Sequence, residues 1–221
     1  MPVAPERIVL ITGASRGIGA QVALQLAAPG THVIVNYREK ADRADSTAQA
    51  VRDAGGQATT MAADIADGAA TAAMIDAIRA RFGRLDAVIL NASAGLHQGA
   101  EPGHAMRVNG EAQKRLATLA MPLMPAGGRF VYVTSHQAHF FPHKAVPKGY
   151  AAIAVGKRAG ESALYAMRSE LDHAGIGFTV VSGDLIDDTI VMRAAAIAKA
   201  ATHAPSPGIV FVGRADHLMT A

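Results

Sequence analysis

The sequence predicts an α/β protein with one doubly wound parallel sheet flanked by helices. Short β-branched runs alternate along the chain with long, alanine-rich amphipathic stretches. Some of the short runs, such as Val88-Ile89-Leu90, are continuously apolar, as strands are when helices cover both faces of a sheet. A glycine-rich loop separates the first run from the first amphipathic stretch. This pattern is typical of a Rossmann-like sheet, and we expect a single domain over residues 1–221.

The two patterns place the elements in chain order, with β-branched residues marking strands and alanine-rich periodic stretches marking helices. We expect strands over residues 7–12, 31–36, 57–61, 85–91, 129–134, 177–181 and 209–212. We expect helices over residues 17–28, 40–54, 68–82, 105–121 and 151–174. Segments 93–104, 136–149 and 185–205 are expected to be loops that shape a pocket, because ligands bind beyond the carboxyl ends of parallel strands.

Composition excludes several classes of protein. Of the 221 residues, 50% are hydrophobic and 18% are charged, so the chain can bury a large core. It has no cysteine, which excludes disulfides, thiolate metal sites and cysteine nucleophiles, and we expect no metal site. The net charge of +3 is spread along the chain and does not indicate a nucleic-acid partner. With no apolar run of about 20 residues and no signal pattern, we expect a cytoplasmic protein that does not bind membranes.

The glycine-rich loop, Thr12–Gly19, is placed where a dinucleotide would bind. Gly13, Gly17 and Gly19 allow the backbone to turn sharply and to approach a pyrophosphate closely. The helix that follows offers free N–H groups and a partial positive charge at its N-terminus. The position of the loop between the first strand and the first helix favours this interpretation over a plain strand–helix turn.

The end of the second strand indicates which nucleotide binds. A site for NAD usually has an acid there to hold the ribose hydroxyls, whereas this chain has Asn36-Tyr37-Arg38. Arg38 and Arg16 would converge on the 2′-phosphate of NADP(H), to which guanidinium groups bind well. Alternatively, Arg38 only opens the next helix on a solvated face. We expect the cofactor to be NADP(H).

With these features the chain resembles the short-chain dehydrogenase/reductase family over nearly its whole length. The TGxxxGxG loop of the family is matched by Thr12–Gly19, and its adenine-capping acid by Asp64. Its NNAG-like segment appears, altered, as Asn91-Ala92-Ser93-Ala94-Gly95. The asparagine that orders a proton-relay water is matched by Asn109, and the serine at the end of the fifth strand by Ser135.

The resemblance implies the site residues. It implies that the catalytic residues are Ser135, Tyr150, Lys157 and Asn109. It implies that cofactor contacts come from Gly13, Ser15, Arg16, Gly17, Ile18, Gly19, Asn36, Tyr37, Arg38, Ala63, Asp64, Ile65, Asn91, Ala92, Ser93, Lys157, Gly183, Asp184, Leu185 and Thr189.

The chain departs from the tyrosine-xxx-lysine motif of the family, because position 153 is Ile and the nearest tyrosine, Tyr150, precedes Lys157 by seven positions. In a regular helix that separation is about 10.5 Å, too far for the two side chains to meet. Pro147 and Gly149 indicate a turn that places Tyr150 at the helix entrance, from where it can swing back. The enoyl-reductase branch of the family has the same six intervening residues.

A second departure lies after the sixth strand. Ser182-Gly183-Asp184 replaces the usual Pro-Gly, and the stretch from Asp184 to Gly208 is short for a family in which it often forms a substrate lid. A site without a working tyrosine, or with another proton donor, also stays open. His136, His139 and His143 are candidates for that donor, although loop solvation or local hydrogen bonding is the more ordinary use of each.

Three functions therefore remain. The first is an NADPH-dependent oxidoreductase that reduces a carbonyl of a small or medium substrate. Ser135 would orient the oxygen, Tyr150 give the proton, Lys157 bind ribose and lower the pKa of Tyr150, and Asn109 anchor a water chain. The second is an NADPH-dependent enoyl thioester (C=C) reductase. The third is a catalytically impaired NADP-binding sensor or assembly protein.

Assembly is also implied by the resemblance. Family members form homodimers or homotetramers through two helices, which correspond here to residues 111–121 and 157–174. The second of these helices carries small residues, Ala159, Gly160, Ala163 and Ala166, that permit close packing. The same residues are equally suited to packing on the chain's own sheet.

Overall fold

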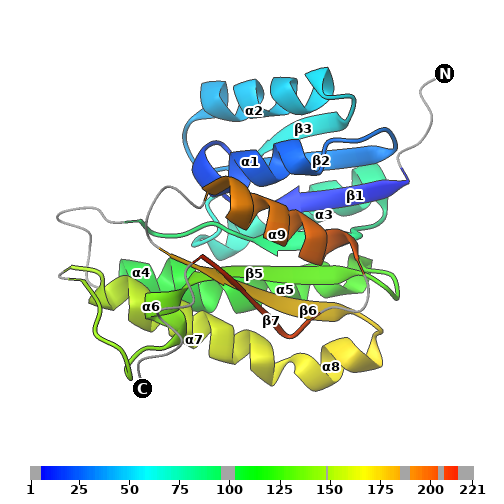
Figure 1. Ribbon diagram of the computed structural model, residues 1–221. Coiled ribbons are helices and arrows are strands. Elements are labelled where there is room, and N and C mark those ends of the chain that lie inside the picture. Colours follow the sequence, from blue (N-terminus) through cyan, green and yellow to red (C-terminus); the bar gives the residue numbers. More distant parts are fainter. Residues whose placement is uncertain (1–5, 96–102, 148, 185–189, 204–206, 214–221) are drawn as a thin grey trace.

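The computed structural model describes residues 6–95, 103–147, 149–184, 190–203 and 207–213, and Figure 1 shows its layered arrangement. Seven parallel strands form one sheet in the order β3-β2-β1-β4-β5-β6-β7. The strands are β1 (Arg7–Ile11), β2 (Thr31–Tyr37), β3 (Gln57–Ala62), β4 (Ala87–Leu90), β5 (Arg129–Ser135), β6 (Gly177–Gly183) and β7 (Ile209–Val212). The strand order reverses between β1 and β4, which makes this the point where such sheets bind ligands. The predicted fold class is confirmed.

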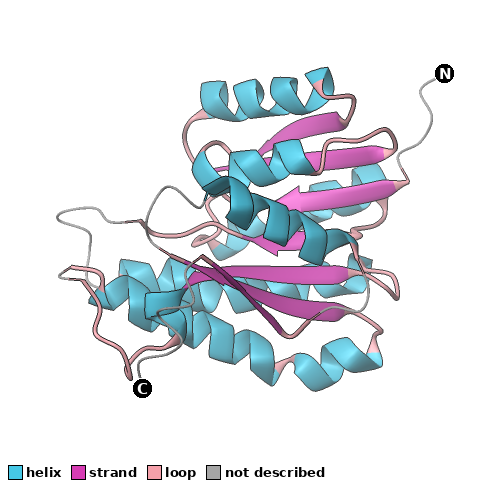
Figure 2. Ribbon diagram, in the orientation of Figure 1, coloured by secondary structure: helices cyan, strands magenta, loops and turns pink. Residues whose placement is uncertain are grey.

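Helices cover both faces of the sheet (Figure 2). They are α1 (Gly17–Gln25), α2 (Ala41–Asp53), α3 (Gly68–Phe82), α4 (His104–Met106), α5 (Ala112–Ala120), α6 (His136–His139), α7 (Ala151–Ala166), α8 (Arg168–His173) and α9 (Ile190–Thr202), with a π-helix η1 (Arg107–Glu111) and a 3₁₀-helix η2 (Met121–Leu123). Buried side chains of α1, α2 and α9 form one core cluster, and those of α3, α5 and α7 form the other. In the described residues, no helix has both the length and the apolar character needed to cross a bilayer.

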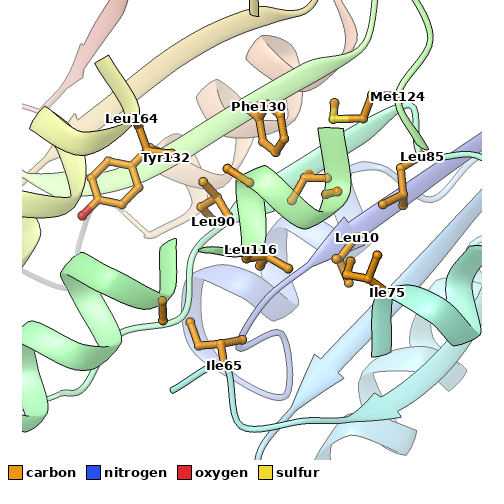
Figure 3. Packing of buried hydrophobic residues seen from close by; sticks show 14 of the residues in the cluster. Leu10, Ile65, Ile75, Leu85, Leu90, Leu116, Met124, Phe130, Tyr132 and Leu164 are labelled. Carbon is orange, nitrogen blue, oxygen red and sulfur yellow. The ribbon is translucent and has the colours of Figure 1, made fainter. Parts of the chain in front are cut away.

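The continuous apolar runs are explained by this arrangement, because the side chains of a strand alternate between two buried faces. Ile8 and Leu10 of β1 enter the cluster on the α3–α5–α7 side, shown in Figure 3. Val9 and Ile11 enter the opposite cluster. All four are buried to within 1% of full burial, and each contributes about 2 kcal/mol of hydrophobic stabilisation.

Four segments differ from the expectation from sequence. The helix expected over 151–174 is divided at Met167, whose N–H bonds to the carbonyl of Leu164 as in a tightened turn. The helix expected over 105–121 contains the π-helical turn η1. The segments taken as loops contain α6 and α9, and α9 buries Ala194, Ile197 and Ala201 at helical spacing, a signal present in the sequence.

Close packing explains the two glycines of α7. A Cβ on Gly160 would collide with the carbonyl oxygen of Asn109 in η1, and a Cβ on Gly156 would lie 2.5 Å from the carbonyl oxygen of Ala105. Helix α7 therefore packs closely against α4 and η1 of the same chain, with backbone against backbone. Tyr132 of β5 lies beneath this crossing, and its hydroxyl donates to the carbonyls of Lys157, at 2.9 Å, and Asn109, at 3.2 Å.

Candidate functional site

The loop between β1 and α1 needs its glycines for steric reasons. Gly13 and Gly17 have positive φ angles of 62° and 56°, which side chains rarely adopt. Gly19 has no room for a side chain, because a Cβ there would lie 2.6 Å from Asn91 Nδ2 and 2.7 Å from the carbonyl oxygen of Gly13. Around Gly17, by contrast, an added Cβ would meet no atom within 4 Å. The loop is thus tightly packed beneath and open above.

Polar side chains from three strand ends hold this loop. Thr12 Oγ1 accepts hydrogen bonds from the backbone N–H groups of Asn91 and Ala92, both at 3.0 Å. Asn91 Nδ2 donates to the carbonyls of Thr12 at 2.9 Å and Gly13 at 3.2 Å. The side chain of Asn36, which is 2% exposed, accepts from the Gly13 N–H at 3.2 Å. Asn36 and Asn91 therefore shape the loop from below.

A cleft of about 590 Å³ lies above the loop at the switch point of the sheet. It brings together fourteen of the expected cofactor residues: Gly13, Ser15, Arg16, Gly17, Ile18, Asn36, Tyr37, Arg38, Ala63, Asp64, Ile65, Asn91, Ala92 and Ser93. Gly19 lies beneath the loop, and Gly183 and Asp184 lie at the end of β6. The expected residues Leu185 and Thr189 lie outside the described residues. Sequence reasoning missed the lining residues Glu39, Lys40, Arg43, Ala94, Gly95 and Val108.

The cleft is basic beside the end of β2. Arg16, Arg38, Lys40 and Arg43 all line it and are all exposed. Arg38 forms an ion pair of 2.8 Å with Glu39, which is weak because both side chains are exposed to solvent. Lys40 and Arg43 had a readable signal, since they closely follow Arg38 and are three positions apart at the start of α2. The side-chain carboxylate of Asp64, across the cleft, accepts from the Ala66 N–H at 2.8 Å.

Ser135 and Tyr150 meet at the carboxyl end of β5. Ser135 is the last residue of that strand, and its Oγ caps α6 by accepting from the Ala138 N–H at 3.2 Å. Tyr150 stands immediately before α7, where its own N–H closes a turn with the carbonyl of Pro147. From this position its hydroxyl lies 2.8 Å from Ser135 Oγ. The expected turn is therefore present, and it brings Tyr150 to Ser135.

The ring of Tyr150 is only 4% exposed and packs against Ala138, Ile153 and Ala154. Burial raises the pKa of Tyr150, while the hydrogen bond from Ser135 and the positive charge of Arg193 lower it in part. Ile153, which stands four positions before Lys157, thus packs against the ring of Tyr150.

Lys157 is buried on the next turns of α7. Its Nζ donates to the carbonyl of Val133 at 3.0 Å. Burial, with a further contribution from the charge of Arg193, lowers the pKa of Lys157 to about 8. We expected Lys157 to lower the pKa of Tyr150, but the groups that lower it in the structure are Ser135 and Arg193.

The buried lysine makes stability depend on pH. Its pKa is about 8 in the folded protein and 10.5 in the unfolded chain, so between these values the unfolded chain binds more protons. The free energy of unfolding should therefore rise with pH across this window, by up to about 3 kcal/mol. In Lys157→Met this rise should be lost. Urea unfolding of both proteins from pH 7 to pH 10.5 measures the difference, and parallel profiles would contradict the prediction.

Asn109 lies in the π-helix η1 and is 1% exposed. Its side-chain oxygen accepts from the Ala94 N–H at 3.3 Å. Its Nδ2 is buried and has no hydrogen-bond partner in the described part of the chain. Because Val108 and Ala94 line the cleft, this amide lies beside it. π-Helical turns of this kind are frequent at functional sites.

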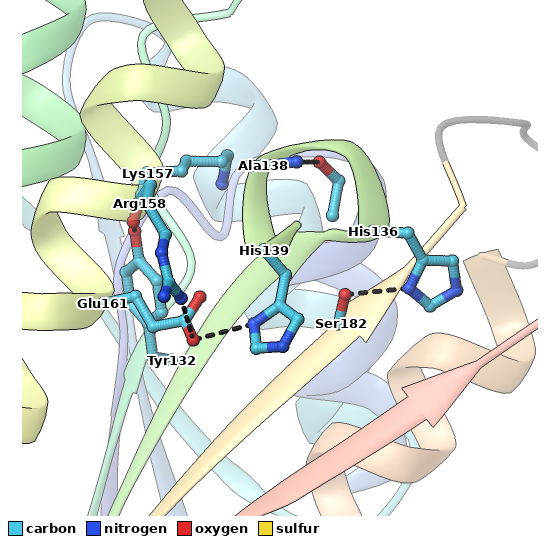
Figure 4. Close-up of polar contacts among 9 residues, drawn as sticks. Tyr132, His136, Ala138, His139, Lys157, Arg158, Glu161 and Ser182 are labelled. Carbon is cyan, nitrogen blue, oxygen red and sulfur yellow. Dashed lines mark hydrogen bonds and ion pairs between the residues drawn. The ribbon is translucent and has the colours of Figure 1, made fainter. Parts of the chain in front are cut away.

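Two of the three candidate histidines are hydrogen-bonded within the fold (Figure 4). The ring nitrogens of His136 bond to Ser182 Oγ at 2.9 Å and to the carbonyl of Val212 at 3.2 Å. His139 Nδ1 lies 2.7 Å from the carboxylate of Glu161, which also pairs with Arg158. His143 is exposed. His136 and His139 are therefore hydrogen-bonded as expected, but their partners lie at least 22 positions away in the sequence rather than nearby.

Comparison with known proteins identifies the family of the chain. A family model described as short chain dehydrogenase matches residues 7–199. The chain is 37% identical over 188 residues to 1-cyclohexenylcarbonyl-CoA reductase of Streptomyces collinus, covering 82% of this chain and 65% of that protein. It is 39% identical over 103 residues to cis-4-hydroxycyclohexanecarboxylate dehydrogenase of Sinomonas cyclohexanicum, covering 47% of this chain and 40% of that one. The chain thus spans less than two thirds of the length of these curated relatives.

Solved structures share the whole fold. The promiscuous reductase LugOII, which catalyses keto-reduction at C1 during lugdunomycin biosynthesis, superposes with a TM-score of 0.83 at 24% identity, over 99% of this chain and 100% of that one. A metagenomic short-chain oxidoreductase in complex with NADP superposes with a TM-score of 0.80 at 24% identity, over 93% and 96%. Fold, loop and family model agree, and the chain belongs to the short-chain dehydrogenase family.

Proposed function

We propose that the protein is an NADPH-dependent oxidoreductase that reduces a carbonyl group of a small or medium organic substrate. The observation that carries this proposal is the 2.8 Å contact between Tyr150 and Ser135 at the end of β5. A tyrosine hydroxyl held by a serine hydroxyl offers one proton and one further hydrogen-bond donor to a developing alkoxide. The described strands form one sheet, which supports a single NADP-binding domain over residues 1–221.

The residues around the cleft fit NADPH. The loop at Gly17 is open to a pyrophosphate, and the N-terminus of α1 directs N–H groups toward the same space. The basic residues Arg16, Arg38 and Lys40 suit a 2′-phosphate, and the metagenomic neighbour was solved with NADP. Lys157 Nζ keeps two further N–H donors for a ribose beyond its bond to Val133.

When bound, NADPH supplies the hydride for the reduction. Ser135 would hold the substrate oxygen, and Tyr150 would transfer its phenolic proton to that oxygen as negative charge develops on it. Asn109, beside the cleft, has a buried Nδ2 suited to anchoring a water that returns a proton to Tyr150. Gly183 and Asp184, at the end of β6, are proposed to contact the cofactor.

Consumption of NADPH by the purified protein tests this function. We expect turnover with members of a panel of ketones and aldehydes, and a higher kcat/KM with NADPH than with NADH. The preference follows from the basic residues at the end of β2, which an NAD ribose would leave without a phosphate to bind. NADPH binding without turnover on any substrate would contradict the proposal and leave only a nucleotide-binding protein.

A second candidate function is reduction of a conjugated C=C bond in a thioester. Two observations favour it: the name of the Streptomyces collinus relative denotes a cyclohexenyl thioester of coenzyme A, and six residues separate Tyr150 from Lys157. The same assay with α,β-unsaturated CoA thioesters separates the two functions. Turnover restricted to the thioesters would replace the first proposal by the second.

We also propose a homodimer or homotetramer. An apolar groove of about 500 Å³ runs between α5 and α7 and is lined in part by Met106, Leu119, Ala159 and Ala163. Ala159 and Ala163 thus face outward, whereas Gly160 packs on η1 within the chain. Light scattering of the purified protein measures the state of assembly.

A further inference from the structure

Helix α9 brings a buried cation toward Ser135 and Tyr150. Arg193 is only 7% exposed, on a helix that packs against α1, β4, β5 and β6. Its guanidinium lies against the backbone of Gly183, where an added Cβ would be 2.8 Å from Cζ and would collide with Nε. Any side chain at position 183 would displace this group. The absence of a side chain at Gly183 therefore gives Arg193 its place at the end of β6.

The end of β6 adjoins the reactive pair. Gly183 is the register partner of Ser135 across β5 and β6, and Ser135 Oγ lies 2.8 Å from the hydroxyl of Tyr150. The guanidinium therefore lies beside the end of β5, which carries Ser135. Its positive charge lowers the pKa of Tyr150 and also that of Lys157.

Other charged or titratable groups also lie in this part of the structure, and most of them have partners of their own. Lys157 on α7 donates to the carbonyl of Val133, and Tyr132 on β5 donates to two carbonyls. Glu161 on α7 binds His139 of α6 and Arg158. His136 of α6 bonds to Ser182 and Val212. The buried Asp184 directly follows Gly183, and its carboxylate lies 2.7 Å from where a Cβ on Gly213 would be. Arg193 is the cation among them whose charge favours the ionised form of Tyr150.

We propose that Arg193 is a positioning residue of the site, whose guanidinium stabilises the phenolate that Tyr150 becomes as it gives its proton to the substrate oxygen. In this chain the positive charge that stabilises the phenolate thus comes from Arg193 of α9 rather than from Lys157 of α7. The proton moves from the tyrosine hydroxyl to the oxygen, and the negative charge left on the phenolate faces the guanidinium. The assignment rests on the proposed function, because it presumes that Tyr150 is the acid.

Removing the charge should make Tyr150 a weaker acid. In Arg193→Gln, we expect kcat for reduction at neutral pH to fall about three- to tenfold. The basic limb of the pH profile of kcat, where Tyr150 loses its proton, should move up by about one pH unit. Arg193→Lys keeps the charge and should stay close to the wild type in both respects. Lys199→Gln, which removes the same charge from an exposed position on α9, is the matched control and should change neither.

Tyrosinate absorbance gives a readout that does not depend on turnover. Comparison with Tyr150→Phe identifies the titration of Tyr150, which should occur at higher pH in Arg193→Gln and in the apolar variant Arg193→Met. If the wild type turns over no substrate, the proposed function fails, yet this titration still tests the inference. An unchanged titration in a folded variant would overturn it. So would a change confined to KM for acidic substrates, which would make Arg193 a substrate contact.

Discussion

Replacing Tyr150 with Phe is expected to lower kcat by about 10²- to 10⁴-fold, the usual contribution of a positioned general acid. The change removes one oxygen atom, and the ring keeps its packing against Ala138, Ile153 and Ala154. Ser135 would remain to orient the substrate oxygen. The hydroxyl that lies 2.8 Å from Ser135 Oγ in the wild type would be gone, so no proton would be delivered from that position. NADPH affinity should be unchanged, since the hydroxyl does not line the nucleotide cleft. Steady-state kinetics and a fluorescence titration with NADPH measure the two effects.

Tyr165→Phe is the matched control for this substitution. Tyr165 lies on α7, and its ring packs edge-on against Phe178 with centroids 5.3 Å apart, a contact that Phe preserves. Its kcat should equal that of the wild type. Wild-type turnover by Tyr150→Phe would assign the proton to another group and remove the central element of the proposed mechanism.

Replacing Gly19 with Ala is expected to weaken NADPH binding about ten- to hundredfold, or about 1.4 to 2.8 kcal/mol. The added methyl would lie 2.6 Å from Asn91 Nδ2 and 2.7 Å from the carbonyl of Gly13, so the loop must move away from α1. The N–H groups that face the pyrophosphate would then be misplaced. Isothermal titration with NADPH measures the loss, and a thermal melt shows whether the variant is folded.

Gly208→Ala serves as its control, because an added Cβ at position 208 meets no atom of the described residues within 4 Å. Its NADPH affinity should equal that of the wild type. If Gly19→Ala bound NADPH as tightly as the wild type, the loop between β1 and α1 would not be the phosphate site.

Local sequence signals were sufficient for the sheet and for the nucleotide cleft. A few neighbouring residues suffice in both cases: the apolar run Val88-Ile89-Leu90 predicts a buried strand, and the glycines at 13, 17 and 19 predict the loop. The position of Tyr150 was also readable, because Pro147 and Gly149 indicate the turn that places it beside Ser135.

The role of Arg193 was not readable in this way. One arginine in an alanine-rich helix resembles a solvated residue, and only the packing of α9 on β6 shows that it is buried. The partner of Lys157 was hidden for the same reason, since its bond goes to a backbone carbonyl 24 positions away. Side-chain contacts between distant segments depend on tertiary geometry, about which local patterns carry no information.

The hydrogen bonds beneath the glycine loop have a consequence for how the nucleotide binds. Thr12, Asn36 and Asn91 fix the loop from three neighbouring strand ends, so its shape does not depend on a bound phosphate. A preorganised receptor loses little conformational entropy on association, and more of the contact energy then appears as affinity. Association of NADPH should accordingly proceed in a single kinetic phase, with no slow rearrangement of the loop after encounter.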